Sequence, residues 1–174
     1  MFYRLSCLAL VVGLVASGCS KSTTSASTTA APPKFTATLS PANEVPAVTN
    51  ADATGSGVAT ITLNVTKVSA GNITAATADF VVTLTGFPAG TTLTGAHIHP
   101  GVAGTTGGVL VSTTLASGEV VLANGTGGLN KLSIPIADPA VAQAIINTPS
   151  AYYFNVHTTL NAGGAARAQL VRAN

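Results

Sequence analysis

Charged side chains are scarce in this chain of 174 residues, where Asp, Glu, Lys and Arg together make up 7%. Tryptophan is absent, and aromatic residues make up only 5%. Because there is no run of Lys or Arg and no aromatic platform, binding to nucleic acids is not expected. Disorder is also excluded, since 47% of the residues are hydrophobic and the net charge is only +2.

Cysteine is nearly absent too, because the chain has only Cys7 and Cys19. Both lie in the N-terminal segment, so the rest of the chain has no thiol. This excludes a disulfide framework and a thiolate metal site in the domain that follows. Any metal ion bound there must use nitrogen and oxygen ligands.

Residues 1–18 are predicted to be a lipoprotein signal peptide. After Arg4, the apolar stretch "LSCLALVVGLVAS" is too short to span a bilayer comfortably. It leads into "VASGC", which resembles a lipobox and makes Cys19 the expected lipidation site. Two or more acyl chains give stable anchoring. The predicted location is the bacterial cell envelope, at the outer membrane where the cell has one, because no aspartate follows the cysteine. The alternative is an ordinary secretory signal with a chance cysteine.

Residues 19–34 then form a predicted tether. Their Ser/Thr/Ala-rich composition ends in a Pro pair and has no apolar period, as in flexible linkers. Residues 35–174 are left as one domain, of a normal size for a single core.

Apolar residues alternate with polar ones through most of this domain. "FTATLS" and "GVATITLNV" are two examples, and the polar positions are largely threonine. Such alternation indicates half-buried strands, and Gly-rich links separate them. We expect an all-β fold, an antiparallel Greek-key-like sandwich or barrel of about eight strands.

The segment "ADPAVAQAIINTPS" breaks the alternation and predicts one short capping helix. Asp138 stands at the N-cap position, Pro139 at the first helical position, and Pro149 closes the segment. The apolar face is expected to contain Ala140, Val141, Ala144 and Ile145.

All three histidines of the chain lie in two predicted strands. In "AHIH", His97 and His99 point to the same face, and His157 lies in "YYFNVHT". If these strands are neighbours, three imidazoles can meet on one sheet face and bind zinc or copper. The alternative is structural, with the imidazoles bonded to backbone groups of the Gly-rich loop that follows His99.

Glu44 lies between two prolines in "SPANEVPAV" and is the weaker candidate for a metal ligand. It could instead pair with Arg167, which alternates with apolar neighbours alongside Gln169, or be merely solvated. No nucleophile motif, phosphate loop or carboxylate pair accompanies the histidines, so no enzymatic activity is expected.

Three motifs, in order, resemble the CHRD (chordin-type) domain family: "LSPANEVPAV", "TGAHIHPGVAGTTGGVLV" and "YYFNVHTTLNAGGAARAQL". The family pattern carries over onto Glu44, Pro46, His97, His99, Gly101, Asn155, His157, Thr158, Arg167 and Gln169. Where the family has glutamate before the arginine and glycine after it, this chain has Ala165 and Ala168. The resemblance implies no established catalysis, and the loss of the glutamate favours a structural or binding role.

Three functions therefore remain open. The first is a lipid-anchored envelope module that binds an envelope protein or surface ligand, or acts structurally. The second is a metalloprotein holding copper or zinc, with or without redox activity. The third, a carbohydrate- or surface-binding module, is indicated by the neutral Thr/Asn face. The H-x-H pair on a β-sandwich also resembles copper–zinc superoxide dismutases, but the other zinc-site residues are absent, so dismutase activity is not expected.

Overall fold

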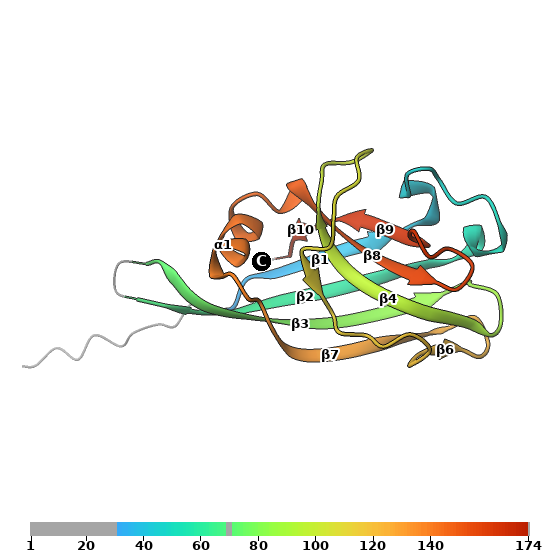
Figure 1. Ribbon diagram of the computed structural model, residues 1–174, viewed down its shortest axis with the longest axis horizontal. Helices are drawn as coiled ribbons and strands as arrows, with labels where there is room; N and C mark the ends of the chain where they lie inside the picture. The colour runs from blue at the N-terminus through green and yellow to red at the C-terminus, as the bar shows by residue number, and fades with distance from the viewer. Residues whose placement is uncertain (1–30, 69–70, 174) are drawn as a thin grey trace, which may run out of the picture. The chain divides into compact units, whose positions relative to one another are not determined.

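The computed structural model describes residues 31–68 and 71–173, so the predicted signal peptide and Cys19 lie outside the described residues. In this part of the chain, ten strands form two five-stranded antiparallel sheets, which lie one over the other in Figure 1. The first sheet has the order β10-β1-β2-β3-β7, and the second has β5-β4-β8-β9 with β6 paired to β4. The predicted antiparallel sandwich with one short helix is confirmed.

The strands are β1 (Lys34–Leu39), β2 (Ser56–Lys67), β3 (Ile73–Thr85), β4 (Thr91–Pro100), β5 (Val111–Ser112), β6 (Val121–Leu122), β7 (Gly127–Pro135), β8 (Tyr152–Thr158), β9 (Ala166–Gln169) and β10 (Val171–Arg172). There are more strands than the eight or so expected, in part because the segment "ARAQLVR" does not form one strand. It divides at Leu170 into β9 in the second sheet and β10, which pairs with β1 in the first. An alternating pattern cannot reveal such a change of sheet, since both halves keep the same period.

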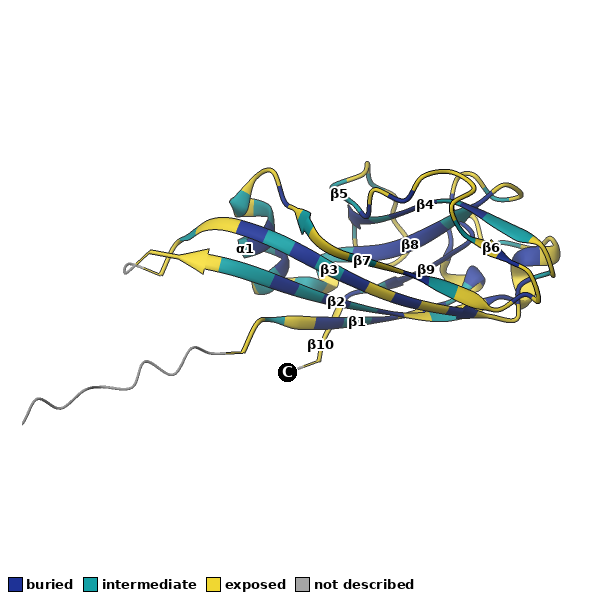
Figure 2. Cartoon of the chain, turned by 90° about the horizontal axis from the view of Figure 1, so that it is seen from below, coloured by how far each residue is buried: buried dark blue, intermediate teal, exposed yellow. Residues whose placement is uncertain are grey.

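The first sheet buries one face and exposes the other, as the alternation predicts. On β3, Phe80, Val82 and Leu84 are buried, while Val81 and Thr83 between them are exposed. Figure 2 shows the result as bands, with buried residues alternating with intermediate ones along β2 and with intermediate and then exposed ones along β3. The inward rows of the two sheets meet in the core, where the rings of Phe80 and Phe154 stack with centroids 5.8 Å apart. This core fixes the second sheet and therefore the direction of its outward side chains.

The helix α1 (Pro139–Asn147) begins as predicted, with the Asp138 side chain accepting a hydrogen bond from the Ala140 backbone at 2.9 Å. Its buried face is partly different from the expected one. Ala142 and Ile145 are buried, whereas Ala140 is exposed. The helix packs against β3, and Ala140, which lies two residues after the capping Asp138, faces away from the core. No helix in the described part of the chain is long and apolar enough to cross a membrane.

Candidate metal centre

The outward face of the second sheet collects the polar residues of all three sequence motifs. β4 and β8 are neighbours, which is the condition on which the meeting of the histidines depended, and β9 lies on the other side of β8. One cross-strand row contains His97, Asn155 and Arg167, and the next contains His99, Tyr153 and Gln169. His157 follows on β8, opposite Gly95. In each of the two rows, the first and last residues are 70 positions apart in sequence (167 − 97 and 169 − 99), and they share one surface because the register places equal parities side by side.

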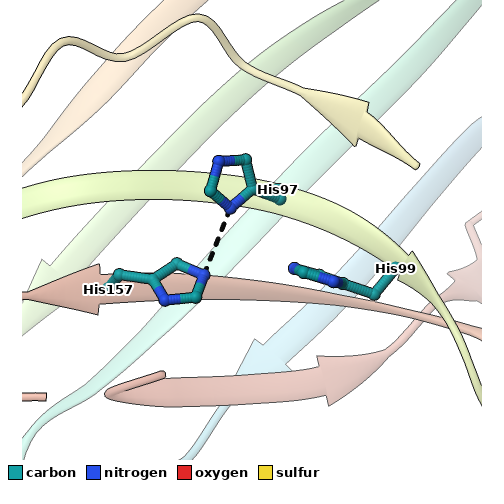
Figure 3. A group of neighbouring side chains, drawn as sticks. All are labelled: His97, His99 and His157. Carbon is teal, nitrogen blue, oxygen red and sulfur yellow. Dashed lines mark hydrogen bonds between the residues drawn. The ribbon is translucent and has the colours of Figure 1, made fainter. Parts of the chain in front are cut away.

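The three histidines lie together on this face, as the sequence predicts (Figure 3). One possible ligand atom from each of His97, His99 and His157 lies within 4.8 Å of the other two. The closest contact joins His97 Nδ1 and His157 Nε2 at 3.1 Å. Two nitrogens bound to one tetrahedral ion at 2.0–2.1 Å lie about 3.4 Å apart. The contact between His97 and His157 is a hydrogen bond, so to surround an ion the cluster must give up that bond, with loss or transfer of its hydrogen, and adjust its side chains.

Hydrogen bonds to the backbone fix the tautomers of two imidazoles. His99 Nδ1 lies 3.0 Å from the Gly107 carbonyl oxygen, and His157 Nδ1 lies 2.9 Å from that of Ala162. A carbonyl oxygen can only accept, so each Nδ1 carries the hydrogen and each Nε2 keeps its lone pair. Metal-binding histidines are oriented in this way by their second nitrogen. Loop pinning and metal binding, which the sequence presented as alternatives, are compatible because they use different nitrogens.

The protonation state of the cluster also suits a ligand role. Burial, together with the neighbouring His157 and His99, lowers the pKa of His97 to about 4. Burial likewise lowers the pKa of His157, although its bond to Ala162 acts in the opposite direction. Both imidazoles are therefore neutral at pH 7, the form that can bind a metal ion.

Gly95 makes room for the ring of His97. A Cβ atom at this position would lie 2.8 Å from His97 Cε1 and 3.8 Å from His157 Cδ2. Because no side chain stands there, the His97 ring can lie over the strand and approach His157. The glycine in "TGAHIH" is therefore part of the site.

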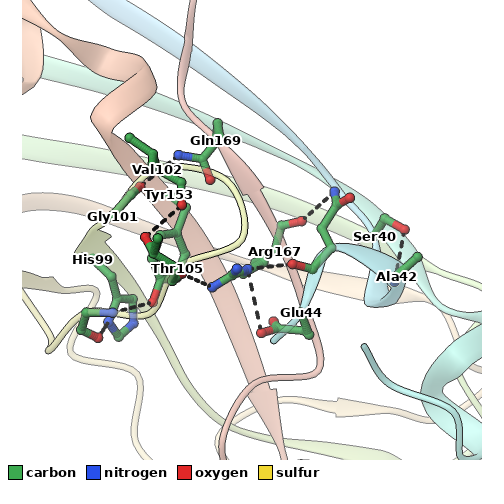
Figure 4. Close-up of polar contacts among 12 residues, drawn as sticks. Ser40, Ala42, Glu44, His99, Gly101, Val102, Thr105, Tyr153, Arg167 and Gln169 are labelled. Carbon is green, nitrogen blue, oxygen red and sulfur yellow. Dashed lines mark hydrogen bonds and ion pairs between the residues drawn. The ribbon is translucent and has the colours of Figure 1, made fainter. Parts of the chain in front are cut away.

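Tyr153 extends the cluster toward β9, and the sequence analysis gave it no role. Its ring lies parallel to that of His99, with centroids 5.0 Å apart, and the Arg167 guanidinium lies 4.4 Å from its centre. Its hydroxyl accepts a hydrogen bond from the Gly107 backbone at 3.2 Å. The shared parity of Tyr153, Asn155 and His157 was the signal that could have identified it. Tyr153 and His99 together hold the loop of residues 101–110 over the sheet (Figure 4).

The structure brings Glu44 to Arg167 and not into the histidine cluster. Glu44 Oε2 lies 4.0 Å from Arg167 Nε, and Glu44 is outside the group formed by the three histidines. This geometry corresponds to the ion pair weighed as one role for Glu44, and it gives no support to Glu44 as a ligand. Burial raises the pKa of Glu44 to about 7, although Arg167 and Asn155 both favour its charged form.

Arg167 is itself fully buried and holds two loops. Its Nε donates to the Asn43 carbonyl at 2.7 Å, and its Nη1 donates to the Thr105 carbonyl at 2.9 Å (Figure 4). The guanidinium thereby joins the loop that contains Glu44 to the loop that follows His99. Such charged donors bridging two backbone segments rigidify both.

The remaining motif residues have structural positions. Gln169 donates to the Gly101 carbonyl at 2.9 Å, and Gly101 has a φ of 146°, which favours glycine. Thr158 donates to the buried carboxylate of Asp52 at 2.6 Å. Asp52 was missed by the sequence analysis, although its place in "NADAT" after a capping asparagine is a recognisable turn signal. Pro46 is exposed and follows a cis peptide bond.

The match to known families agrees with these motifs. The CHRD domain family is matched over residues 35–170. The chain belongs to the CHRD domain family. A search of curated proteins and a search of solved structures gave no significant match. Ala165, which the sequence motif aligns with a glutamate of the family pattern, is fully buried. Its backbone N–H donates to the Val156 carbonyl at 2.8 Å, so this residue extends the pairing between β8 and the start of β9.

Proposed function

We propose that this CHRD domain binds one zinc or copper ion through His97 Nδ1, His99 Nε2 and His157 Nε2. The observation that carries the proposal is the tautomer arrangement. Two imidazoles are fixed by backbone carbonyls so that their lone pairs lie on the same side as the third nitrogen. A structural role alone would use the Nδ1 bonds and would leave the buried His99 Nε2 without a partner.

Three neutral imidazoles are ligands that suit zinc and copper. His97 and His157 are only half-buried, so an ion at the cluster can be reached from solvent and has room for a further ligand. Among the described residues, no cysteine and no carboxylate joins the histidine group. We therefore propose a binding module and not an enzyme, in which the ion is retained or handed on.

The experiment is a metal titration of untagged protein. Because the chain has three histidines in total, every imidazole ligand can be removed with three single variants. Wild type is expected to bind one equivalent of zinc or copper in competition with a chromophoric chelator. Loss of an outer-shell partner of a metal ligand typically lowers metal affinity by about 10–100-fold. Removal of a ligand itself should cost more, so His97→Ala, His99→Ala and His157→Ala should each lose more affinity than that.

Thr36→Ala, on the outward face of the first sheet, is the matched control and should bind like wild type. Retention of less than a tenth of an equivalent by wild type would contradict the proposal, and so would an unchanged affinity in His97→Ala.

We further propose that the domain is lipid-anchored through Cys19 at the bacterial cell envelope. The support is the sequence "VASGC" and the Ser/Thr/Ala-rich segment that separates it from β1. The partner is then the membrane through the anchor, and the domain lies outside the cytoplasm. Cys19→Ala should release the domain from the membrane fraction or leave an uncleaved precursor. A soluble wild-type protein with a free N-terminal residue other than Cys19 would refute the anchor.

A further inference from the structure

Four buried side-chain atoms in the described residues have no hydrogen-bond partner: Glu44 Oε1, His99 Nε2, Asn155 Oδ1 and Arg167 Nη2. All four belong to the outward face of the second sheet or to the loop packed on it. Buried polar atoms are almost always paired in folded proteins. Their concentration in one layer indicates that this layer is completed by something the chain does not supply.

Two of the four atoms complement each other. Glu44 Oε1 is an acceptor and Arg167 Nη2 is a donor, and they belong to the ion pair already described. The other two, His99 Nε2 and Asn155 Oδ1, are both acceptors. They cannot satisfy each other, and a cation between them would satisfy both.

The orientation of the Asn155 amide follows from its bond to Glu44. That bond lowers the pKa of the carboxyl group, so the amide nitrogen donates and the carboxylate accepts. Glu44 lies on the β9 side, against Arg167 and Gly164. Because the amide nitrogen of Asn155 is held on the β9 side, its oxygen points toward β4. There the residue paired with Asn155 is His97.

We infer that Asn155 Oδ1 is the fourth donor to the ion bound by His97, His99 and His157. This inference rests on the proposed function and completes the site as three nitrogens and one oxygen. Asn155 is only 2% exposed, so its oxygen cannot turn to bulk water as an alternative. Glu44, which the sequence suggested as a ligand, instead acts as a positioning residue that holds the amide.

A harder fourth donor changes the metal preference of the site. Zinc and copper(II) accept an oxygen donor, whereas copper(I) prefers softer donors. Loss of the Asn155 oxygen should therefore weaken zinc binding more than copper(I) binding. This difference is a readout that a purely structural role for Asn155 would not produce.

The test measures zinc and copper(I) affinities of untagged wild type, Asn155→Leu and Asn155→Asp by chelator competition. Asn155→Leu is expected to lose about 10–100-fold in zinc affinity, with a much smaller change for copper(I). Asn155→Asp keeps an oxygen donor and should bind zinc at least as tightly as wild type. Tyr153→Phe is the control, because it perturbs the same buried face without removing a proposed ligand atom.

Two outcomes separate the inference from the proposed function. If wild type binds no ion, both fall. If binding requires the three histidines but Asn155→Leu retains wild-type zinc affinity, the inference is wrong and the proposed function stands. Should Asn155→Leu fail to fold, NMR of wild type decides. Zinc must then shift the side-chain amide resonances of Asn155, and unchanged resonances in the zinc-bound protein would overturn the inference.

Discussion

The outward faces of the two sheets differ although both belong to strands of one sandwich. On the first sheet, the outward residues are mainly threonines with a few valines, and most are exposed or half-buried. On the second sheet, His99, Tyr153, Asn155 and Arg167 also point outward, yet each is at most 5% exposed. The difference shows that a strand face can be polar and still buried, provided that loops cover it and supply hydrogen bonds.

The loops that cover the second sheet are the source of this burial. Residues 101–110 are held by His99, Tyr153 and Arg167, and residues 159–164 are held through His157 and Thr158. The first sheet has no comparable contacts from loops among the described residues. Substitutions on its outward face should consequently cost little, whereas those on the second sheet should affect folding, metal binding or both.

The largest difference is expected from Arg167→Met. The change removes donors to the Asn43 and Thr105 carbonyls and leaves Glu44 without its partner. Breaking such a buried pair should lower the free energy of unfolding by about 3–5 kcal/mol, measured by denaturant titration. The control is Thr36→Ala on the first sheet, with an expected change within about 0.5 kcal/mol. Equal effects at the two positions would contradict the distinction between the faces.

Within the first sheet, two adjacent residues should behave oppositely. Leu84 is 1% exposed in the core, and Thr83 beside it is exposed. Leu84→Ala should cost about 2–5 kcal/mol through lost burial and a residual cavity. Thr83→Ala should have little effect in the same denaturant measurement. A negligible cost at Leu84 would mean that the inward face is assigned wrongly.

The pH dependence of stability should expose two opposing groups on the second sheet in metal-free protein. His97 has a pKa of about 4 against an ordinary 6.5, so the native state binds fewer protons and loses stability as pH falls through that range. Glu44 has a pKa of about 7 against 4.5, so the native state binds more protons and loses stability as pH rises through that range.

Between pH 4.5 and 6.5 the two contributions therefore oppose each other. Glu44→Gln removes the second one, and its stability should rise more steeply with pH than that of wild type. His97→Gln should change the slope in the other direction. Denaturation midpoints at several pH values measure both slopes, and three parallel profiles would show that these groups are not perturbed as described.

Gly95→Ala should have the smallest effect on stability of these changes. Its effect on metal binding should nevertheless be clear. The added Cβ would meet the edge of the His97 ring, a flexible side chain that can move aside. Unfolding should change little, whereas zinc or copper affinity should fall about 10-fold as the ring turns away. Gly163→Ala, where nothing lies within 4 Å of the new atom, is the matched control. Unchanged metal affinity in Gly95→Ala would show that the ring position is not important.

The first sheet was easier to predict from the sequence than the second sheet and the helix. Alternation was sufficient for β1, β2 and β3, because each has one buried apolar face and one face that is exposed or half-buried. It was insufficient for the last segment, since the change of sheet at Leu170 depends on which strand each half pairs with. It also misplaced part of the helix face, because Ala140 and Ala142 are equally apolar and only packing distinguishes them.

At the site, the sequence predicted the meeting of the three histidines from parity and from the family motifs. It offered the Glu44–Arg167 pair as one of three roles for Glu44, but it could not choose among them, because loop conformation decides that contact. Nor could it find the free oxygen of Asn155, since the donors and acceptors of a buried amide are known only once its neighbours are placed. The proposed carbohydrate- or surface-binding alternative for the threonine face of the first sheet stays a prediction.

X-ray absorption spectroscopy of zinc- or copper-loaded untagged protein tests the central claim most directly. It reports the number of imidazole ligands and their distances without a variant that could disturb the fold. The metal-centre account predicts scattering from three imidazoles with metal–nitrogen distances near 2.0–2.1 Å. A spectrum with one imidazole or none, or an ion that dialysis removes before measurement, would contradict a metal centre formed by His97, His99 and His157.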